Sequence, residues 1–170
     1  MPATFGRLLT AMVTPFDDRG EVDLEQARRL ARGLVETGSE GLIVAGTTGE
    51  SPTVTYAEKL TLFKAIKEEV GSLVPIIAGT GDNCTRDSIE FTHRAEAVGV
   101  DGALLVVPYY NKPPQEGLYQ HFRAIAESTA LPVILYNVPG RTGINLTAET
   151  TIRLSSVRNV IGIKEASGDM

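Results

Sequence analysis

The 170-residue sequence has one cysteine, Cys84, and only two histidines, His93 and His121. A single cysteine can form neither an internal disulfide nor a thiolate metal cage. The histidines lack partners at the spacing of a metal site or a Ser-His-Asp triad, and Glu90-x-x-His93 lacks the second copy that a carboxylate-bridged metal motif needs. The sequence therefore predicts no bound metal and argues against metal-dependent and Ser-His-Asp hydrolases.

Clustered positive charge is also missing. The formal net charge is −5 and no run of lysine and arginine occurs, whereas nucleic acids and membrane surfaces select such runs. The segment MPATFGRLLTAMVTP matches neither a signal peptide nor a membrane span, and no G-x-G-x-x-G or G-x-x-x-x-G-K-[ST] motif indicates a nucleotide site. We therefore expect a cytoplasmic protein that binds small molecules, with no nucleic-acid or membrane partner.

Six short apolar runs recur at intervals of about thirty residues. Runs that are apolar throughout are typical of strands buried on both faces of a parallel sheet. The predicted strands are residues 8–13, 42–45, 74–78, 103–107, 133–136 and 160–163.

Helical patterns lie between these runs. The first begins after Asp23, a good N-cap, and ends before Gly38, whereas the second begins with a capping box of Thr55 and Glu58. Weaker patterns cover residues 88–98, residues 118–128 and Ala148–Leu154. The chain thus alternates strand and helix five times and ends on a sixth strand.

Polar residues follow every predicted strand directly, as in Gly46-Thr47-Thr48 and Tyr136-Asn137. A closed barrel directs all of these strand ends toward one centre, whereas an open doubly wound sheet collects ligands at one switch point. We therefore predict an α/β fold, an incomplete (βα)8 TIM barrel with about six strands and five helices. Residues 1–170 would form one partial domain, because a closed barrel of this type needs eight strands.

Lys164 follows the sixth apolar run. A lysine at such a position is ordinarily a solvated charge. Here Ile161 and Ile163 surround it with apolar side chains, and Glu165 should point to the opposite face of the strand. Desolvation lowers the pKa of a lysine, and a neutral amine can attack a ketone. Lys164 is therefore a candidate Schiff-base nucleophile.

Other strand ends carry groups with two interpretations each. The turn GTTGE at residues 46–50 is either a cap-forming turn or an anion cradle built from backbone N–H groups and the hydroxyls of Thr47 and Thr48. Arg141 in PGRTG is either a surface arginine or a ligand for a substrate carboxylate. Three tyrosines near strand ends are either packing aromatics or site residues: Tyr109, Tyr110 and Tyr136.

Four segments, GTTGES, PYYNKPPQEGLYQHF, LYNVPGRTG and GIKEASGD, closely resemble in order and spacing the dihydrodipicolinate synthase family. The resemblance spans the whole chain, although family members continue well beyond this length. It implies a class I aldolase-like barrel that condenses pyruvate with L-aspartate 4-semialdehyde to 4-hydroxy-tetrahydrodipicolinate, in the diaminopimelate route to lysine. It also implies no metal or organic cofactor, and a homo-oligomer built from tight dimers.

The same resemblance implies roles for individual residues. Lys164 would form the Schiff base with pyruvate, and Thr47, Tyr110 and Tyr136 would relay protons, with Tyr110 reaching a neighbouring subunit. Thr47 and Thr48 would hold the pyruvate carboxylate. Arg141 would guide or bind the carboxylate of the semialdehyde.

A regulatory site at the tight-dimer interface is a further implication. Feedback-inhibited relatives bind lysine near the positions of Ser51, Pro52, Tyr56, Lys59, Asn83, Asp87 and Tyr109. Tyr56, Lys59 and Asp87 depart from the residues found there in such relatives, and the positive charge of Lys59 should repel a lysine ligand. We therefore expect this chain to escape feedback inhibition.

Two alternatives to the synthase stay open. An N-acetylneuraminate lyase or another sugar-acid aldolase would use the same lysine, but the sialic-acid lyases lack an arginine at the position of Arg141. A folding or assembly fragment without turnover is the other alternative. Because six strands of an eight-stranded barrel leave two unpaired edges, we expect a dimer or larger species in either case.

Overall fold

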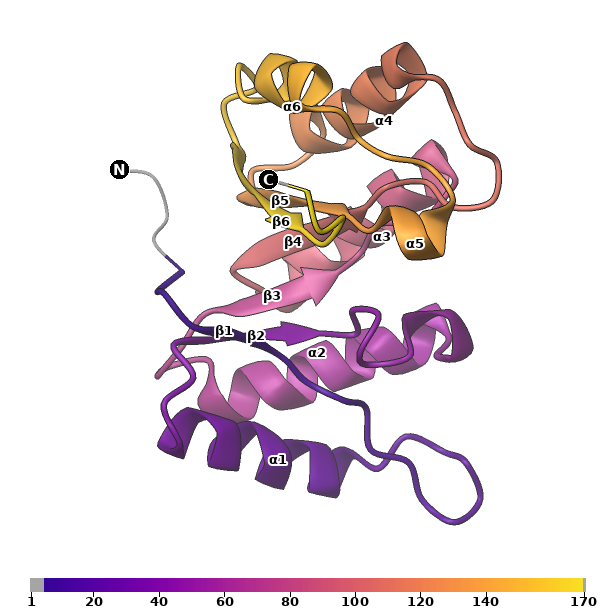
Figure 1. Ribbon diagram of the computed structural model, residues 1–170. Helices are drawn as coiled ribbons and strands as arrows, with labels where there is room; N and C mark the ends of the chain where they lie inside the picture. The colour runs from indigo at the N-terminus through magenta and orange to yellow at the C-terminus, as the bar shows by residue number, and fades with distance from the viewer. Residues whose placement is uncertain (1–4, 170) are drawn as a thin grey trace. The chain divides into compact units, whose positions relative to one another are not determined.

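The computed structural model describes residues 5–169 of the chain (Figure 1). It divides into two compact units, one of residues 5–79 with Arg94–Gly102 and the other of Thr80–His93 with residues 103–169. None of the helices in the described part has the length and hydrophobicity that a membrane span requires.

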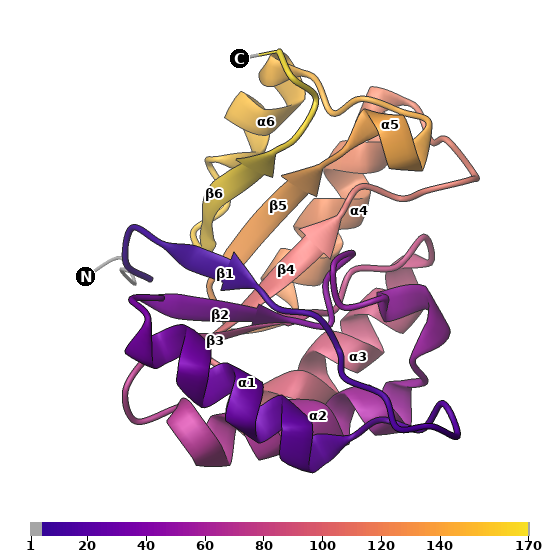
Figure 2. The same ribbon diagram turned by 60° about the horizontal axis from the view of Figure 1, so that its bottom comes forward.

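The first unit contains three parallel strands and two long helices. Strand β1 (Leu9–Ala11) pairs with β2 (Gly41–Val44), which pairs with β3 (Ile76–Gly79). Helix α1 (Leu24–Glu36) connects β1 to β2, and the 3-10 helix η1 (Ser51–Thr53) and α2 (Tyr56–Val70) connect β2 to β3. Helices α1 and α2 lie side by side along the strands (Figure 2).

Local hydrogen bonds fix both helix starts where the sequence predicts them. The Asp23 carboxylate accepts from the Gln26 N–H at 2.9 Å. In the capping box, the Thr55 N–H donates to the Glu58 carboxylate at 2.7 Å, and the Glu58 N–H donates to the Thr55 hydroxyl at 3.3 Å. These contacts satisfy backbone donors that have no partner within the helix, so each boundary is set within four residues of chain.

The second unit contains strands β4 (Gly102–Val106), β5 (Val133–Asn137) and β6 (Val160–Glu165), paired in parallel in that order. The first residue of β4, Gly102, is assigned to the first unit. Helix α3 (Thr85–Val98) contributes its first nine residues to this unit, together with α4 (Gln115–Glu127), α5 (Pro139–Thr142) and α6 (Ala148–Leu154). Helices α4 and α6 lie together on one side of the strands (Figure 2). Large apolar side chains form the core of this unit, and those that are fully buried include Phe91, Leu105, Leu118, Phe122, Ile125 and Leu135.

The pairing of β5 with β6 is irregular at its start. Val133 lies opposite Val160, but Ile134 lies opposite Gly162, so Ile161 is an extra residue that forms a β-bulge. After the bulge the register is regular through Asn137 and Glu165. The bulge decides which face of β6 each later side chain occupies, because successive residues of a strand point to opposite faces.

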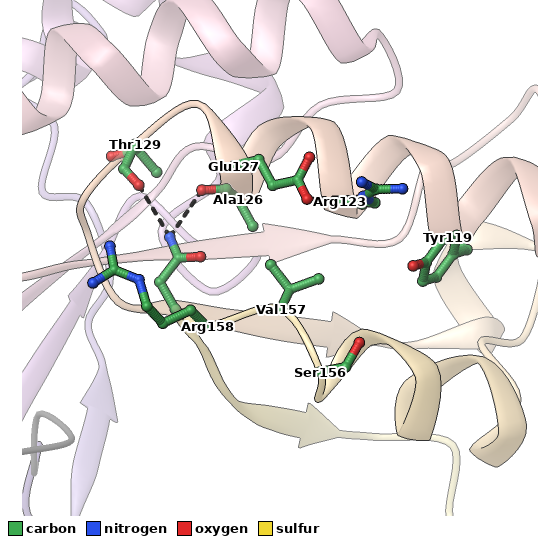
Figure 3. Close-up of a pocket in the computed structure, with 9 residues that line it drawn as sticks. Tyr119, Arg123, Ala126, Glu127, Thr129, Ser156, Val157 and Arg158 are labelled. Carbon is green, nitrogen blue, oxygen red and sulfur yellow. Dashed lines mark hydrogen bonds and ion pairs between the residues drawn. The ribbon is translucent and has the colours of Figure 1, made fainter.

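The segment before β6 is anchored by a side-chain amide. The Asn159 Nδ2 group donates to the carbonyls of Ala126 at 2.9 Å, Leu131 at 2.9 Å and Thr129 at 3.2 Å. Figure 3 shows two of these bonds at the edge of a shallow polar pocket between α4 and this segment. The amide thus fixes where β6 enters the sheet.

Three details differ from the sequence-based expectations. The first strand is shorter than the predicted 8–13, and the described residues form six α-helices rather than five because PGRT folds as the short helix α5. Strand β6 was expected to be buried on both faces, yet Ile161 and Gly162 are exposed. The apolar run is therefore a correct signal for a strand but not for its burial.

Candidate functional site

Lys164 and Tyr136 lie close together near the carboxyl ends of two strands of the second unit. They occupy paired positions on β6 and β5, and the Lys164 Nζ lies 4.3 Å from the centre of the Tyr136 ring. An ammonium over an aromatic face is attracted by the negative potential of the ring. The structure therefore brings together the predicted nucleophile and one predicted member of the proton relay.

The surroundings of Lys164 are less apolar than the sequence suggests. Tyr136 is buried, with 5 % of its surface exposed, but Lys164 itself is only half-buried. Ile161, which was expected to help desolvate the amine, is 36 % exposed. The amine thus lies against the Tyr136 ring but keeps part of its surface exposed to solvent.

Behind this pair, on the opposite face, lie Asn137 and Glu165. The Asn137 Nδ2 donates to the two carboxylate oxygens of Glu165 at 2.9 and 3.1 Å. Burial alone would raise the pKa of Glu165, but the side chain of Asn137 and the N–H of Ser167, among other donors, lower it overall. Glu165 and Lys164 are successive residues of β6, so their side chains point to opposite faces of the strand.

Arg141 lies on the short helix α5, which follows β5 directly. Pro139 provides the fixed φ of the first turn, and Gly143 ends the helix in the left-handed region with φ 76°. The Thr142 hydroxyl donates to the Ile144 carbonyl at 2.9 Å and holds the end of the turn. Arg141 is exposed on this rigid turn, where its guanidinium can bind a carboxylate.

Tyr110 is the most exposed large hydrophobic residue of the described part, at 89 %. Its φ is 73°, and the N–H of Asn111 donates to the carbonyl of Tyr109 at 2.9 Å. A hydrogen bond between residues two apart around a positive φ defines a strained γ-turn. The backbone thus holds the Tyr110 ring away from its own unit.

Two asparagine side chains fasten this turn. Asn83 Nδ2 donates to the Tyr109 carbonyl at 3.3 Å, and Asn111 Nδ2 donates to the Asn83 carbonyl at 3.0 Å. Burial, together with the nearby Asp82 carboxylate, raises the pKa of the Tyr109 hydroxyl. The segment from Tyr109 to Asn111 is therefore tied to the start of α3.

Thr47 and Thr48 belong to the first unit, in the turn after β2. The carbonyl of Gly46 accepts from the N–H groups of Gly49 and Ser51, so these donors serve the turn itself rather than a bound anion. Thr47 is half-buried and Thr48 is exposed. The roles of Thr47 and Thr48 as donors to a bound carboxylate stay a prediction.

The residues expected near a regulatory site divide between the two units. Ser51, Tyr56 and Lys59 lie in the first, where Lys59 is buried with its Nζ 5.3 Å from the centre of the Tyr56 ring. Asn83, Asp87 and Tyr109 lie in the second, and the Asp87 carboxylate is 3.5 Å from Arg86. The expected insensitivity to lysine stays a prediction.

His121 on α4 is a buried polar residue outside this site. Its Nδ1 lies 2.9 Å from the Thr85 hydroxyl, whereas its Nε2 is buried without a hydrogen-bond partner. Burial lowers the pKa of His121 to about 4, although the Asp82 carboxylate alone would raise it. The sequence gives no metal or catalytic partner for His121, and within residues 5–169 no group of three or more His, Cys, Asp or Glu side chains could hold a metal.

Asn137 is the residue of this site that the sequence reasoning missed. It is 1 % exposed, and its amide also donates to the Asn145 side chain at 2.7 Å and accepts from the Leu146 N–H at 3.0 Å. A signal was present, because an amide at the end of a buried strand must find partners. Its partner Glu165 is distant in sequence and could not be identified without the strand register.

The family profile described as "Dihydrodipicolinate synthetase family" matches residues 4–170. The chain belongs to this family. The 4-hydroxy-tetrahydrodipicolinate synthase of Moorella thermoacetica is 61 % identical over 166 residues, a match that covers 98 % of this chain and 57 % of the relative. The chain thus spans little more than half the length of this curated relative of the dihydrodipicolinate synthetase family.

Solved structures of the dihydrodipicolinate synthetase family agree with the fold. The Bacillus anthracis dihydrodipicolinate synthase has a TM-score of 0.96 at 52 % identity, and the Acinetobacter baumannii synthase complexed with pyruvate has 0.95 at 48 %. Each match covers 98 % of this chain and 57 % of the other. The fold class is therefore the α/β TIM barrel, of which residues 5–169 form six strands.

Oligomeric state is not fixed by membership of the family. A dihydrodipicolinate synthase variant described as monomeric has a TM-score of 0.92 and is 50 % identical, over 95 % of this chain and 54 % of that one. The expected dimer or larger species therefore stays a prediction.

Proposed function

We propose that this chain is part of a Schiff-base-forming synthase that condenses pyruvate with L-aspartate 4-semialdehyde to 4-hydroxy-tetrahydrodipicolinate, in the diaminopimelate route to lysine. Membership of the family and the 61 % identity to the Moorella thermoacetica synthase support this activity. The observation that carries it is the position of the Lys164 amine, 4.3 Å from the centre of the buried Tyr136 ring.

The proposed chemistry begins when the Lys164 ammonium gives up a proton and the resulting amine adds to the ketone carbon of pyruvate. Loss of water leaves an iminium, which withdraws electrons from the adjacent methyl carbon and makes its protons acidic. Removal of one proton gives an enamine, whose carbon adds to the aldehyde of the second substrate. The amino group of that substrate then displaces the Lys164 amine from the imine carbon, which closes the ring and releases the enzyme. Each stage needs a group that accepts and returns a proton.

Tyr136 is placed for that proton transfer, because its ring lies beside the amine. We propose Thr47 and Tyr110 as further members of the relay, with Tyr110 reaching the site of a neighbouring subunit. Its strained turn and exposed ring are consistent with this role. Thr47 and Thr48 would hold the pyruvate carboxylate, and Arg141 the carboxylate of the semialdehyde.

The mechanism as proposed uses no metal and no organic cofactor, because the covalent imine itself acts as the electron sink. We also propose a cytoplasmic enzyme, which the single unpaired thiol of Cys84 fits. A homo-oligomer belongs to the same proposal, since Tyr110 would serve a neighbouring copy.

A turnover assay on a hybrid chain tests this function. In the hybrid, this chain is continued by the C-terminal part of the Moorella thermoacetica synthase beyond the matched region. With pyruvate and L-aspartate 4-semialdehyde, we expect product from the hybrid and none from its Lys164→Ala variant. Lys112→Ala provides a control, because it removes an exposed lysine of the same unit. Equal turnover by the Lys164→Ala variant would refute the proposal.

The same assay separates the alternatives. A sugar-acid aldolase would cleave N-acetylneuraminate and leave the semialdehyde unused. A fragment without turnover would show product with the hybrid but none with the chain of 170 residues alone.

A further inference from the structure

The orientation of Lys164 depends on the register of two strands that pair irregularly. The bulge at Ile161 shifts β6 by one residue relative to β5. Since side chains alternate between faces, a further slip of one residue would turn Lys164 to the face that Glu165 now occupies. Exposure of Ile161 and Gly162 leaves little packing in this part of β6 to oppose such a slip.

Contacts beyond the bulge oppose it instead. Asn137 and Glu165 are directly paired, one residue after the pair Tyr136 and Lys164. The Asn137 amide binds both oxygens of the Glu165 carboxylate, and the N–H of Ala166 donates to the Asn137 carbonyl at 2.9 Å. These bonds form only in the register observed.

The pair is itself held on both sides. On one side lies the loop before α6. Its Asn145 side chain accepts a hydrogen bond from the Asn137 amide at 2.7 Å, and its Leu146 N–H donates one to the same amide at 3.0 Å. On the other strand, the Ser167 N–H donates to Glu165 Oε1 at 2.7 Å. A slip of β6 would take the Glu165 carboxylate away from the Asn137 amide, and loss of a hydrogen bond by an almost fully buried polar group is unfavourable.

We propose that Asn137 and Glu165 are positioning residues, which fix the register of β5 and β6 so that the Lys164 amine lies against Tyr136. Neither touches the reacting atoms. This inference rests on the proposed function, because it assigns the pair a role in imine formation at Lys164. It adds two residues to the site that lie on the face away from the substrate.

Reversal of the hydrogen-bond polarity tests the pair. In Asn137→Asp, two carboxylates face each other, so the contact becomes repulsive. In the double variant Asn137→Asp/Glu165→Gln, an amide again faces a carboxylate, with donor and acceptor exchanged between strands. A merely structural loss at either position would add in the double variant, whereas a positioning pair would be restored.

The measurement is the rate of borohydride trapping of the pyruvate imine at Lys164 in the hybrid chain, at saturating pyruvate, with the folded fraction followed by circular dichroism. We expect Asn137→Asp to slow trapping about tenfold or more, because displacement of a reacting group by about 1 Å has effects of this size. Glu165→Gln should slow it less, and the double variant should return to within about threefold of the parent.

Asn159→Ala is the matched control. Asn159 also makes three hydrogen bonds through its amide, but at the opposite end of β6. Its loss should lower stability and leave the trapping rate of the folded protein within about twofold of the parent.

Trapping of Asn137→Asp and Glu165→Gln at the parental rate would overturn the inference and leave the proposed function intact. The inference would also be overturned if the double variant trapped the imine more slowly than Asn137→Asp. An equally large fall of the trapping rate in Asn159→Ala would overturn it as well. If Asn137→Asp does not fold, Glu165→Gln and the double variant provide the same comparison. A parental hybrid that pyruvate does not label would overturn the proposed function and this inference together.

Discussion

His121 should make the chain sensitive to acid. In the unfolded chain the pKa of this histidine would be near 6.5, whereas burial lowers its pKa to about 4 in the folded state. Protons therefore bind the unfolded state preferentially between these values, and stability is lost as the pH falls from 6.5 toward 4. One pKa unit corresponds to about 1.4 kcal/mol, so the total effect is about 3 kcal/mol, of which roughly 2–3 kcal/mol is lost by pH 4.5.

Replacement of His121 by leucine should remove this dependence. At pH 7 the variant loses the contact with the Thr85 hydroxyl but also removes the buried, unpartnered Nε2, so the two effects oppose each other. At pH 4.5 the variant has no histidine to protonate at this position. We therefore expect the stability of His121→Leu relative to the parent to rise by roughly 2–3 kcal/mol between pH 7 and pH 4.5.

Urea unfolding of the 170-residue chain at both pH values provides the assay, with the free energy extrapolated to water. Carboxylates that do not interact with His121 affect parent and variant alike, so their contribution cancels in the difference, whereas Asp82 interacts with His121 in the parent alone. His93→Leu is the matched control, because His93 is exposed on α3. The reasoning fails if His121→Leu and the parent lose the same free energy on acidification, or if His93→Leu gives the larger change.

Three further predictions concern the site and the surface. In the hybrid, Arg141→Leu should impair use of the semialdehyde far more than imine formation with pyruvate, since a charge-assisted pair to one substrate is lost; equal losses in both steps would exclude this role. In urea unfolding, Tyr110→Gly should leave the free energy of unfolding unchanged or raise it by up to about 1 kcal/mol, because relief of the positive φ offsets the entropy cost of glycine. A clear loss of stability would mean that the ring packs within the chain. Light scattering at micromolar concentration should show a dimer or larger species, since Tyr110, Leu8 and Val13 are each more than half exposed, and a stable monomer would contradict this expectation.

Features that depend on neighbouring residues could be predicted from the sequence. The caps at Asp23 and Thr55 involve residues within a few positions, and each side chain satisfies a backbone donor of its own helix. The short helix α5 also depends only on neighbouring residues, but its sequence pattern fits two structures and was interpreted as a turn. PGRTG reads as a turn, yet proline at the first helical position and glycine after the last one also enclose one helical turn.

Features that depend on register could not be predicted in this way. The sequence indicates Lys164 as a strand-end lysine, but its position opposite Tyr136 follows from the bulge at Ile161, which no local pattern encodes. The pairing of Asn137 with Glu165 has the same origin. Tyr110 adopts a positive φ although tyrosine does not favour it, and Asn83, which is distant in sequence, holds the turn through hydrogen bonds with Tyr109 and Asn111.

The most direct test of the account is the site of covalent labelling by pyruvate. The hybrid chain is incubated with pyruvate, reduced with borohydride, digested and mapped by mass spectrometry. We predict one modified residue, Lys164, with labelling abolished in Lys164→Ala and retained in Lys112→Ala. Modification at another lysine, or undiminished labelling of Lys164→Ala, would contradict the claim that this strand-end amine is the nucleophile.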